Sequence, residues 1–261
     1  MIKAIASDLD GTLLLHGAQS LNPEIYDIIL KLKEHGIAFI SASGRQLASQ
    51  HNLFAPIVNE LSYIAENGAL CLHNGETIIT TGIERTLALQ VANEVTNRPG
   101  CKVVISGASS CYLLSGDDAF FHHVSQEMNN VTTAVDSFEE IKEPILKIAY
   151  YEDGDIIASS DYFRKIFEKD LKVITSGNVW VDFIPYDCNK AVALRILLDK
   201  MNILPEEVIS FGDQQNDVEM LTLTGKSYAM AEAVPEAKEC ADEITDSVEK
   251  TLLELLKNLG K

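Results

Sequence analysis

The sequence predicts an α/β protein with a doubly wound parallel sheet, into which a smaller α/β module with an antiparallel sheet is inserted. Three observations support this prediction. A strand–helix–strand pattern opens the chain, and the same pattern resumes from Lys190. The segment between them changes to hairpins and helices, and it carries most of the aromatic residues. Strands that alternate with helices form parallel sheets, whereas strands joined by short turns form antiparallel ones.

The opening pattern has clear local signals. The apolar run Ile2–Ala6 predicts a buried strand, and Asn22-Pro23-Glu24 combines the capping residue, proline and acid that are typical of a helix start. Apolar residues then recur on one helical face until Gly36, and the continuous apolar run 37–40 predicts a second buried strand. A right-handed crossover joins such strands in parallel.

The middle of the chain predicts the inserted module. After a third short strand and a hairpin signalled by Asn74-Gly75, the pattern changes to helix, hairpin, helix, strand, helix and hairpin, the last with a turn at Gly177-Asn178. From Lys190 onward, helices and strands alternate again. We therefore predict a core domain from residues 1–82 and 186–261, and an inserted domain from residues 83–185.

Composition narrows the class of partner. The 261 residues include 39 acidic and 21 basic ones, for a formal charge of −18, which disfavours binding to nucleic acid. No apolar run reaches the length of a membrane span, and the start of the chain lacks the layout of a signal peptide, so we expect a cytoplasmic protein that does not bind membranes. Five scattered cysteines without paired spacing argue against a disulfide framework or a zinc site. The sequence does not indicate an oligomeric state.

Two carboxylates follow the first predicted strand. Asp8 and Asp10 share a side by the alternation of a strand, and the chain turns at Gly11. Close carboxylates repel unless a cation separates them or one keeps a proton. They can therefore hold Mg²⁺ together with a substrate phosphate, or act as a nucleophile and an acid–base group, and one site can do both. A solvated turn at the end of a strand is the plain structural alternative.

Four separated segments lie at ligand-facing positions of the predicted core. They are Asp8-Leu9-Asp10-Gly11-Thr12-Leu13, Ser43-Gly44-Arg45, a single Lys190 at a helix start, and Gly212-Asp213-Gln214-Gln215-Asn216-Asp217. In this order, the chain resembles a haloacid dehalogenase superfamily hydrolase of the Cof-type phosphatase subfamily, over its whole length. That resemblance implies a Rossmann-like core and identifies the insertion as a large α/β cap of the C2 type, which selects the substrate.

The resemblance also implies catalytic roles. Asp8 would attack phosphorus and form an aspartyl-phosphate, while Asp10 would protonate the leaving oxygen and later deprotonate water. A carboxylate can act as such a nucleophile once a cation and hydrogen-bond donors offset the repulsion between the anions. The implied enzyme is a phosphoric monoester hydrolase that acts on a small metabolite. Sugar phosphates are the expected substrates, and phosphorylated cofactors such as pyridoxal phosphate or flavin mononucleotide are the alternative.

Binding roles follow from the same resemblance. The phosphate would be bound by Leu9, Ser43, Gly44, Lys190 and Asn216. Mg²⁺ would be held by Asp8, the backbone oxygen of Asp10, and Asp213, with Asp217 orienting Lys190 or a metal-bound water from outside the ligand set. Backbone N–H groups and a hydroxyl at a strand-to-helix turn suit phosphoryl oxygens.

The chain departs from the family pattern in one turn. Ala231-Glu232-Ala233 replaces the family's Gly-Asn-Ala, so we expect a changed substrate preference or lower turnover.

The motifs leave two other functions open. A phosphomutase would use the same aspartyl-phosphate, and a weakly catalytic sensor would only bind a phosphorylated ligand. The intact pair of aspartates speaks against the sensor.

Overall fold

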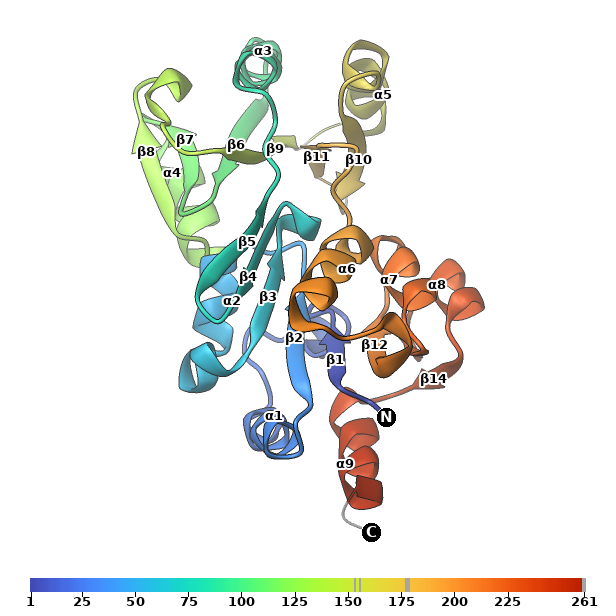
Figure 1. Cartoon of the computed structure of the whole chain (residues 1–261). Helices are drawn as coiled ribbons and strands as arrows, with labels where there is room; N and C mark the ends of the chain where they lie inside the picture. The colour runs from blue at the N-terminus through green and yellow to red at the C-terminus, as the bar shows by residue number, and fades with distance from the viewer. Residues whose placement is uncertain (153, 155, 177–178, 260–261) are drawn as a thin grey trace. The chain divides into compact units, whose positions relative to one another are not determined.

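The computed structural model describes residues 1–152, 154, 156–176 and 179–259, and these form two compact units (Figure 1). Unit 1 comprises residues 1–45, 50–79 and 189–261, and unit 2 comprises residues 46–49 and 80–188. The α/β class is confirmed. The function of unit 2 as a cap that selects the substrate stays a prediction. No helix in the described part of the chain is both long and apolar enough to cross a bilayer.

Unit 1 contains a sheet of eight strands in the order β14-β13-β12-β1-β2-β3-β4-β5. Their bounds are β1 (Ala4–Ser7), β2 (Ala38–Ala42), β3 (Ser62–Ala65), β4 (Leu70–His73), β5 (Glu76–Thr80), β12 (Val208–Gly212), β13 (Lys226–Met230) and β14 (Glu243–Thr245). The strands from β14 to β3 are parallel, and β4 runs antiparallel to β3. The predicted turn between β4 and β5 has Asn74 and Gly75 at positive φ, as a type I′ hairpin turn requires.

The helices of unit 1 join these strands. They are α1 (Glu24–Glu34), α6 (Lys190–Met201), α7 (Val218–Leu223), α8 (Pro235–Cys240) and α9 (Val248–Leu259), while α2 (Leu47–Leu53) is divided between the units. One face of the sheet buries Ala4 and Ile40 against apolar residues of α6 such as Leu194. Ile5 and Phe39 alternate with these residues and are buried on the opposite face. A sheet buried on both faces explains why its central strands are continuous apolar runs.

The strand order places the carboxyl end of β1 at the centre of the sheet. β1 pairs with β2 on one side and with β12 on the other, so the chain winds outward in two directions from this strand. In open parallel sheets, ligands bind beyond the carboxyl ends of the strands where the winding reverses. Residues that directly follow β1, β2 and β12 are therefore the candidates for function.

Unit 2 contains a sheet of six strands in the order β10-β11-β9-β6-β7-β8. The strands are β6 (Cys101–Gly107), β7 (Cys111–Leu114), β8 (Thr132–Val135), β9 (Ile145–Glu152), β10 (Lys172–Ser176) and β11 (Trp180–Ile184), and the helices are α3 (Arg85–Thr96), α4 (Asp118–His122) and α5 (Ile156–Phe167). The predicted hairpin turn at Gly177-Asn178 lies outside the described residues.

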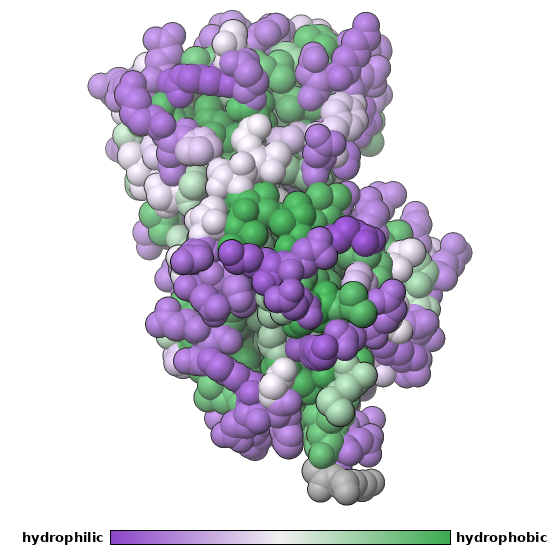
Figure 2. All heavy atoms as spheres, viewed as in Figure 1, coloured by the Kyte–Doolittle hydropathy of each residue, from purple (hydrophilic) through white to green (hydrophobic). Residues whose placement is uncertain are grey.

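The sheet of unit 2 departs from the prediction in one strand. β8 was not predicted, and it pairs parallel to β7, whereas the other pairs are antiparallel. The residues Thr132 and Thr133 of β8 are polar and Ala134 is exposed, so the strand lacks the alternating apolar pattern that signals a buried strand. On the face seen in Figure 2, hydrophilic side chains surround apolar patches.

Candidate active site

Unit 1 brings Lys190 and two aspartates together in its interior. The Nζ atom of Lys190 donates to Oδ1 of Asp8 at 2.7 Å and to Oδ1 of Asp217 at 2.6 Å. Asp8 directly follows β1, Asp217 follows β12, and Lys190 is the first residue of α6, whose start is capped by the side chain of Asn189. The Lys190 side chain has 0% exposure, so its charge faces these carboxylates and not solvent.

A third aspartate completes the cluster. Asp213 directly follows β12, and its Oδ1 accepts a hydrogen bond from Oγ1 of Thr12 at 2.8 Å, while its Oδ2 accepts one from Nε2 of Gln214 at 2.8 Å. The loop that carries Thr12 can approach because Gly11 has no side chain. A Cβ at this position, where φ is +82°, would collide with the carboxylate of Asp213.

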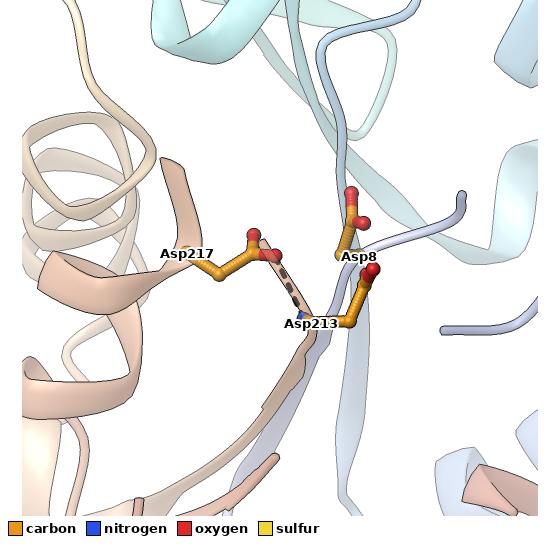
Figure 3. A group of neighbouring side chains, drawn as sticks. All are labelled: Asp8, Asp213 and Asp217. Atoms are coloured by element: carbon orange, nitrogen blue, oxygen red, sulfur yellow. Dashed lines mark hydrogen bonds between the residues drawn. The ribbon is translucent and has the colours of Figure 1, made fainter. Parts of the chain in front are cut away.

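Asp8, Asp213 and Asp217 together form a group that can hold a metal ion (Figure 3). Each offers a carboxylate oxygen, and these oxygens all lie within 4.8 Å of one another. Both oxygens of Asp217 already accept hydrogen bonds, Oδ1 from Lys190 and Oδ2 from the backbone N–H groups of Asp213 and Gln214 at 3.0 Å each. Asp8 and Asp213 therefore have more acceptor capacity left for a cation than Asp217 has.

Burial and crowding control the protonation of these groups. Burial raises the pKa of Asp8 well above its usual range, Lys190 opposes this shift, and the charges of Asp217 and Asp213 add to it. Burial also raises the pKa of Asp213, against the hydrogen bonds from Gln214 and Thr12. The cluster thus contains three carboxylates and one ammonium, which contacts two of them, and a divalent cation would relieve the excess negative charge. Hard oxygen donors of this kind are the ligands of Mg²⁺, so the residues fit this ion.

Lys190 stays charged in spite of its burial. Burial alone would lower the pKa of its ammonium group, but the charges of Asp217 and Asp8, with the hydrogen bonds that both accept, raise it above the usual value. A buried and permanently charged ammonium beside Asp8 can neutralise an anion that approaches this carboxylate.

Asp10 lies apart from the acidic cluster, although the sequence placed it beside Asp8. Its side chain is 55% exposed, and both of its carboxylate oxygens accept hydrogen bonds from Arg45. The group of aspartates that can hold a metal ion includes Asp217, and the side chain of Asp10 is not part of it. The role that the resemblance implied for Asp10 in metal binding uses its backbone oxygen, and it stays a prediction.

The predicted phosphate-binding residues other than Lys190 occupy the loops after β1, β2 and β12. Leu9 follows Asp8 and is buried, and Ser43 and Gly44 follow β2, where Oγ of Ser43 accepts a hydrogen bond from the backbone N–H of Arg45 at 3.1 Å. Asn216 lies in a short 3₁₀ turn formed by Gln215–Asp217. Their contacts with a phosphate stay a prediction.

The structure adds a contact of Asn67, which the sequence analysis did not include among the site residues. Its Oδ1 accepts a hydrogen bond from Nδ2 of Asn216 at 2.9 Å, and a Cβ on Gly44 would lie 3.1 Å from the same oxygen. Asn67 has a φ of +55° within the turn Glu66–Gly68, where the two flanking residues also have positive φ. The contact with Asn216, 149 positions away, was not visible in the sequence.

Glu232, the residue that departs from the family pattern, has a contact of its own. Its carboxylate lies 3.6 Å from Nδ1 of His16, and both side chains are largely exposed. The adjacent chain reaches the acidic cluster through Val234, whose N–H donates to the backbone oxygen of Asp213 at 2.9 Å.

The fold and the site define an α/β protein with buried aspartates and a lysine beyond the carboxyl ends of its parallel strands. A family model described as haloacid dehalogenase-like hydrolase matches residues 5–251, and the chain belongs to this family. The family predicted from the four motifs is thereby confirmed.

Relatives and solved structures agree with this assignment. The 5-amino-6-(5-phospho-D-ribitylamino)uracil phosphatase YbjI of Escherichia coli is 29% identical over 233 residues, which cover 89% of this chain and 86% of that protein. An HMP-PP phosphatase of Cronobacter sakazakii is 24% identical and covers 90% of this chain and 86% of its own. A solved structure from Eubacterium rectale has a TM-score of 0.88, with 29% identity and 98% coverage of both chains. The named relatives are phosphatases, which agrees with the predicted class of enzyme.

Proposed function

We propose that the protein is a Mg²⁺-dependent phosphatase that hydrolyses phosphomonoesters of small metabolites, with Asp8 as the nucleophile. The observation that carries this proposal is the buried cluster in which Lys190 contacts both Asp8 and Asp217, next to Asp213. The phosphatase names of the relatives support the reaction class. The residues of this cluster would act on the phosphoryl group, which every phosphomonoester shares.

The first step would transfer the phosphoryl group to the enzyme. A carboxylate oxygen of Asp8 forms a bond to phosphorus, the bond between phosphorus and the ester oxygen breaks, and a proton from Asp10 goes to the departing oxygen. Lys190 holds Asp8 in place and neutralises part of the added negative charge. Ser43, the N–H groups of Leu9 and Gly44, and Asn216 would bind the phosphoryl oxygens.

The second step would return the enzyme to its starting state. A water molecule attacks phosphorus, Asp10 takes its proton, and the bond between phosphorus and Asp8 breaks to release inorganic phosphate. Asp8, Asp213 and the backbone oxygen of Asp10 would hold Mg²⁺, which supplies positive charge against the phosphoryl oxygens when bound. Asp217 would stay outside the ligand set, since it already contacts Lys190 and two backbone N–H groups.

The substrate we propose is a phosphate ester of a sugar or sugar alcohol. The relative from Escherichia coli is named for a substrate in which the phosphate is borne by a ribityl group, and this supports an alkyl phosphate. We assign the choice among such esters to residues 83–185, because the cluster in unit 1 provides groups for a phosphate and not for a particular leaving group.

The test measures release of inorganic phosphate from a panel of sugar and cofactor phosphates and from p-nitrophenyl phosphate, with Mg²⁺ or with chelator. We compare the wild type, Asp8→Asn and the control Asp27→Asn, which changes an exposed aspartate on α1. The proposal expects release that needs Mg²⁺, is lost in Asp8→Asn and is kept in the control. Release that persists in Asp8→Asn would exclude Asp8 as the nucleophile. Retention of the phosphate on an isomerised product would indicate a mutase instead.

A further inference from the structure

Arg45 and Asp10 form an ion pair with two hydrogen bonds next to the acidic cluster. Nε of Arg45 donates to Oδ2 of Asp10 at 2.7 Å, and Nη2 of Arg45 donates to Oδ1 at 2.6 Å. This is the two-pronged geometry in which a planar guanidinium matches a carboxylate, and it fixes orientation as well as distance. The Arg45 side chain is only 19% exposed, so solvent competes little for it.

Arg45 is itself held firmly by its backbone. Its N–H donates to Oγ of Ser43, and its carbonyl oxygen accepts a hydrogen bond from the N–H of Glu66 at 3.1 Å. Burial does not hold the Asp10 side chain in place, because more than half of this side chain is exposed in the loop after β1. An exposed carboxylate samples several rotamers unless a partner selects one of them. In this pair, therefore, the arginine is the fixed member and the aspartate is the positioned one.

We infer that Arg45 is the positioning residue for Asp10, the acid–base group of the reaction. The inference rests on the proposed function, in which Asp10 gives a proton to the leaving oxygen. Arg45 orients the carboxylate in the free enzyme, and one of its two hydrogen bonds must open when Asp10 contacts the leaving group. The remaining bond keeps the carboxylate aligned while the proton is transferred.

The inference predicts an effect that depends on the leaving group. Ribose 5-phosphate releases an alkoxide, which needs a proton as it departs, whereas p-nitrophenyl phosphate releases a stable phenolate that does not. A positioned general acid contributes on the order of 100- to 10,000-fold to a rate, and a misaligned one loses part of this factor. The value of kcat/KM reports only the steps up to the departure of the leaving group, and so excludes the later attack of water, in which Asp10 also acts. We expect Arg45→Ala to lower kcat/KM for ribose 5-phosphate by roughly 10- to 100-fold, and for p-nitrophenyl phosphate by less than about 3-fold.

Two further variants separate positioning from other roles. Arg45→Lys keeps the charge and can make one of the two contacts, so it should recover part of kcat/KM for ribose 5-phosphate. Arg195→Ala removes an exposed arginine of α6 and should match the wild type with both substrates. Thermal denaturation should show that both Arg45 variants fold.

The outcomes distinguish this inference from the proposed function. An equal fall in kcat/KM for both substrates would show that Arg45 serves the phosphoryl group or the fold, and would overturn the inference while leaving Asp8 as the nucleophile. A wild type that hydrolyses neither substrate, or an Asp8→Asn variant that still hydrolyses both, would overturn the proposed function and the inference with it.

Discussion

Replacing Lys190 by methionine tests how the buried charges are balanced. Methionine is similar in length and fills the same space, so the variant removes the ammonium without opening a large cavity. Lys190 contacts Asp8 at 2.7 Å and Asp217 at 2.6 Å, and its side chain is fully buried. Removing one partner of a buried ion pair costs roughly 3–5 kcal/mol, because the other charge stays buried without compensation. We expect a loss of this size in the free energy of unfolding in chelator.

The assay is urea unfolding followed by two signals. Circular dichroism follows helices in both units, and the fluorescence of Trp180, the single tryptophan of the chain, follows unit 2. The second signal therefore shows whether unit 2 keeps its own stability. A second variant, Asp217→Asn, completes a double-mutant cycle with Lys190→Met.

The double-mutant cycle tests whether an unpaired buried carboxylate causes the loss of stability. If the loss arises from an unpaired carboxylate, the double variant should be more stable than the sum of the two single changes predicts, by on the order of 1–3 kcal/mol. A loss below about 1 kcal/mol in Lys190→Met, or additive single effects, would show that the buried charges are not balanced as the distances indicate.

Three other predictions concern the metal, the phosphate and pH. Mg²⁺ at about 100 times its dissociation constant should stabilise the wild type by about 2.7 kcal/mol in thermal denaturation. Asp213→Asn should abolish this gain in stability. In chelator the variant should be no less stable than the wild type, because burial raises the pKa of Asp213 and the folded state disfavours its charge. An undiminished Mg²⁺ effect would show that Asp213 is not a metal ligand. Asn67→Ala frees Asn216 from a hydrogen bond worth about 1 kcal/mol and should raise KM about 5-fold with kcat nearly unchanged, and steady-state kinetics with an unchanged KM would contradict this. Burial lowers the pKa of His51, so the contribution of this residue to stability is present above its unfolded pKa of about 6.5 and is lost as the pH falls through the lowered value. His51→Gln should therefore flatten the pH dependence of the unfolding free energy between pH 7 and 5. An unchanged slope would show that His51 does not cause this dependence.

Most elements of the fold followed from local signals. The start of α1 and the turn at Asn74-Gly75 were predicted because capping residues and glycine act on their immediate neighbours. The strand β8 was missed because its polar residues give no periodic pattern, and its pairing with β7 depends on the sheet around it. Local chemistry marks where elements begin and end, but it does not determine which edge strand joins a sheet.

The sequence by itself determined the family, the α/β class and the position of Asp8 at the end of a buried strand, since these depend on short motifs and apolar periodicity. Only the tertiary structure decided the partners of the charged groups. Lys190 meets Asp8 across 182 positions, and Arg45 binds Asp10 across 35. The physical reason is that a side-chain pair in the interior depends on how strands β1, β2 and β12 lie side by side, and no local pattern records that arrangement.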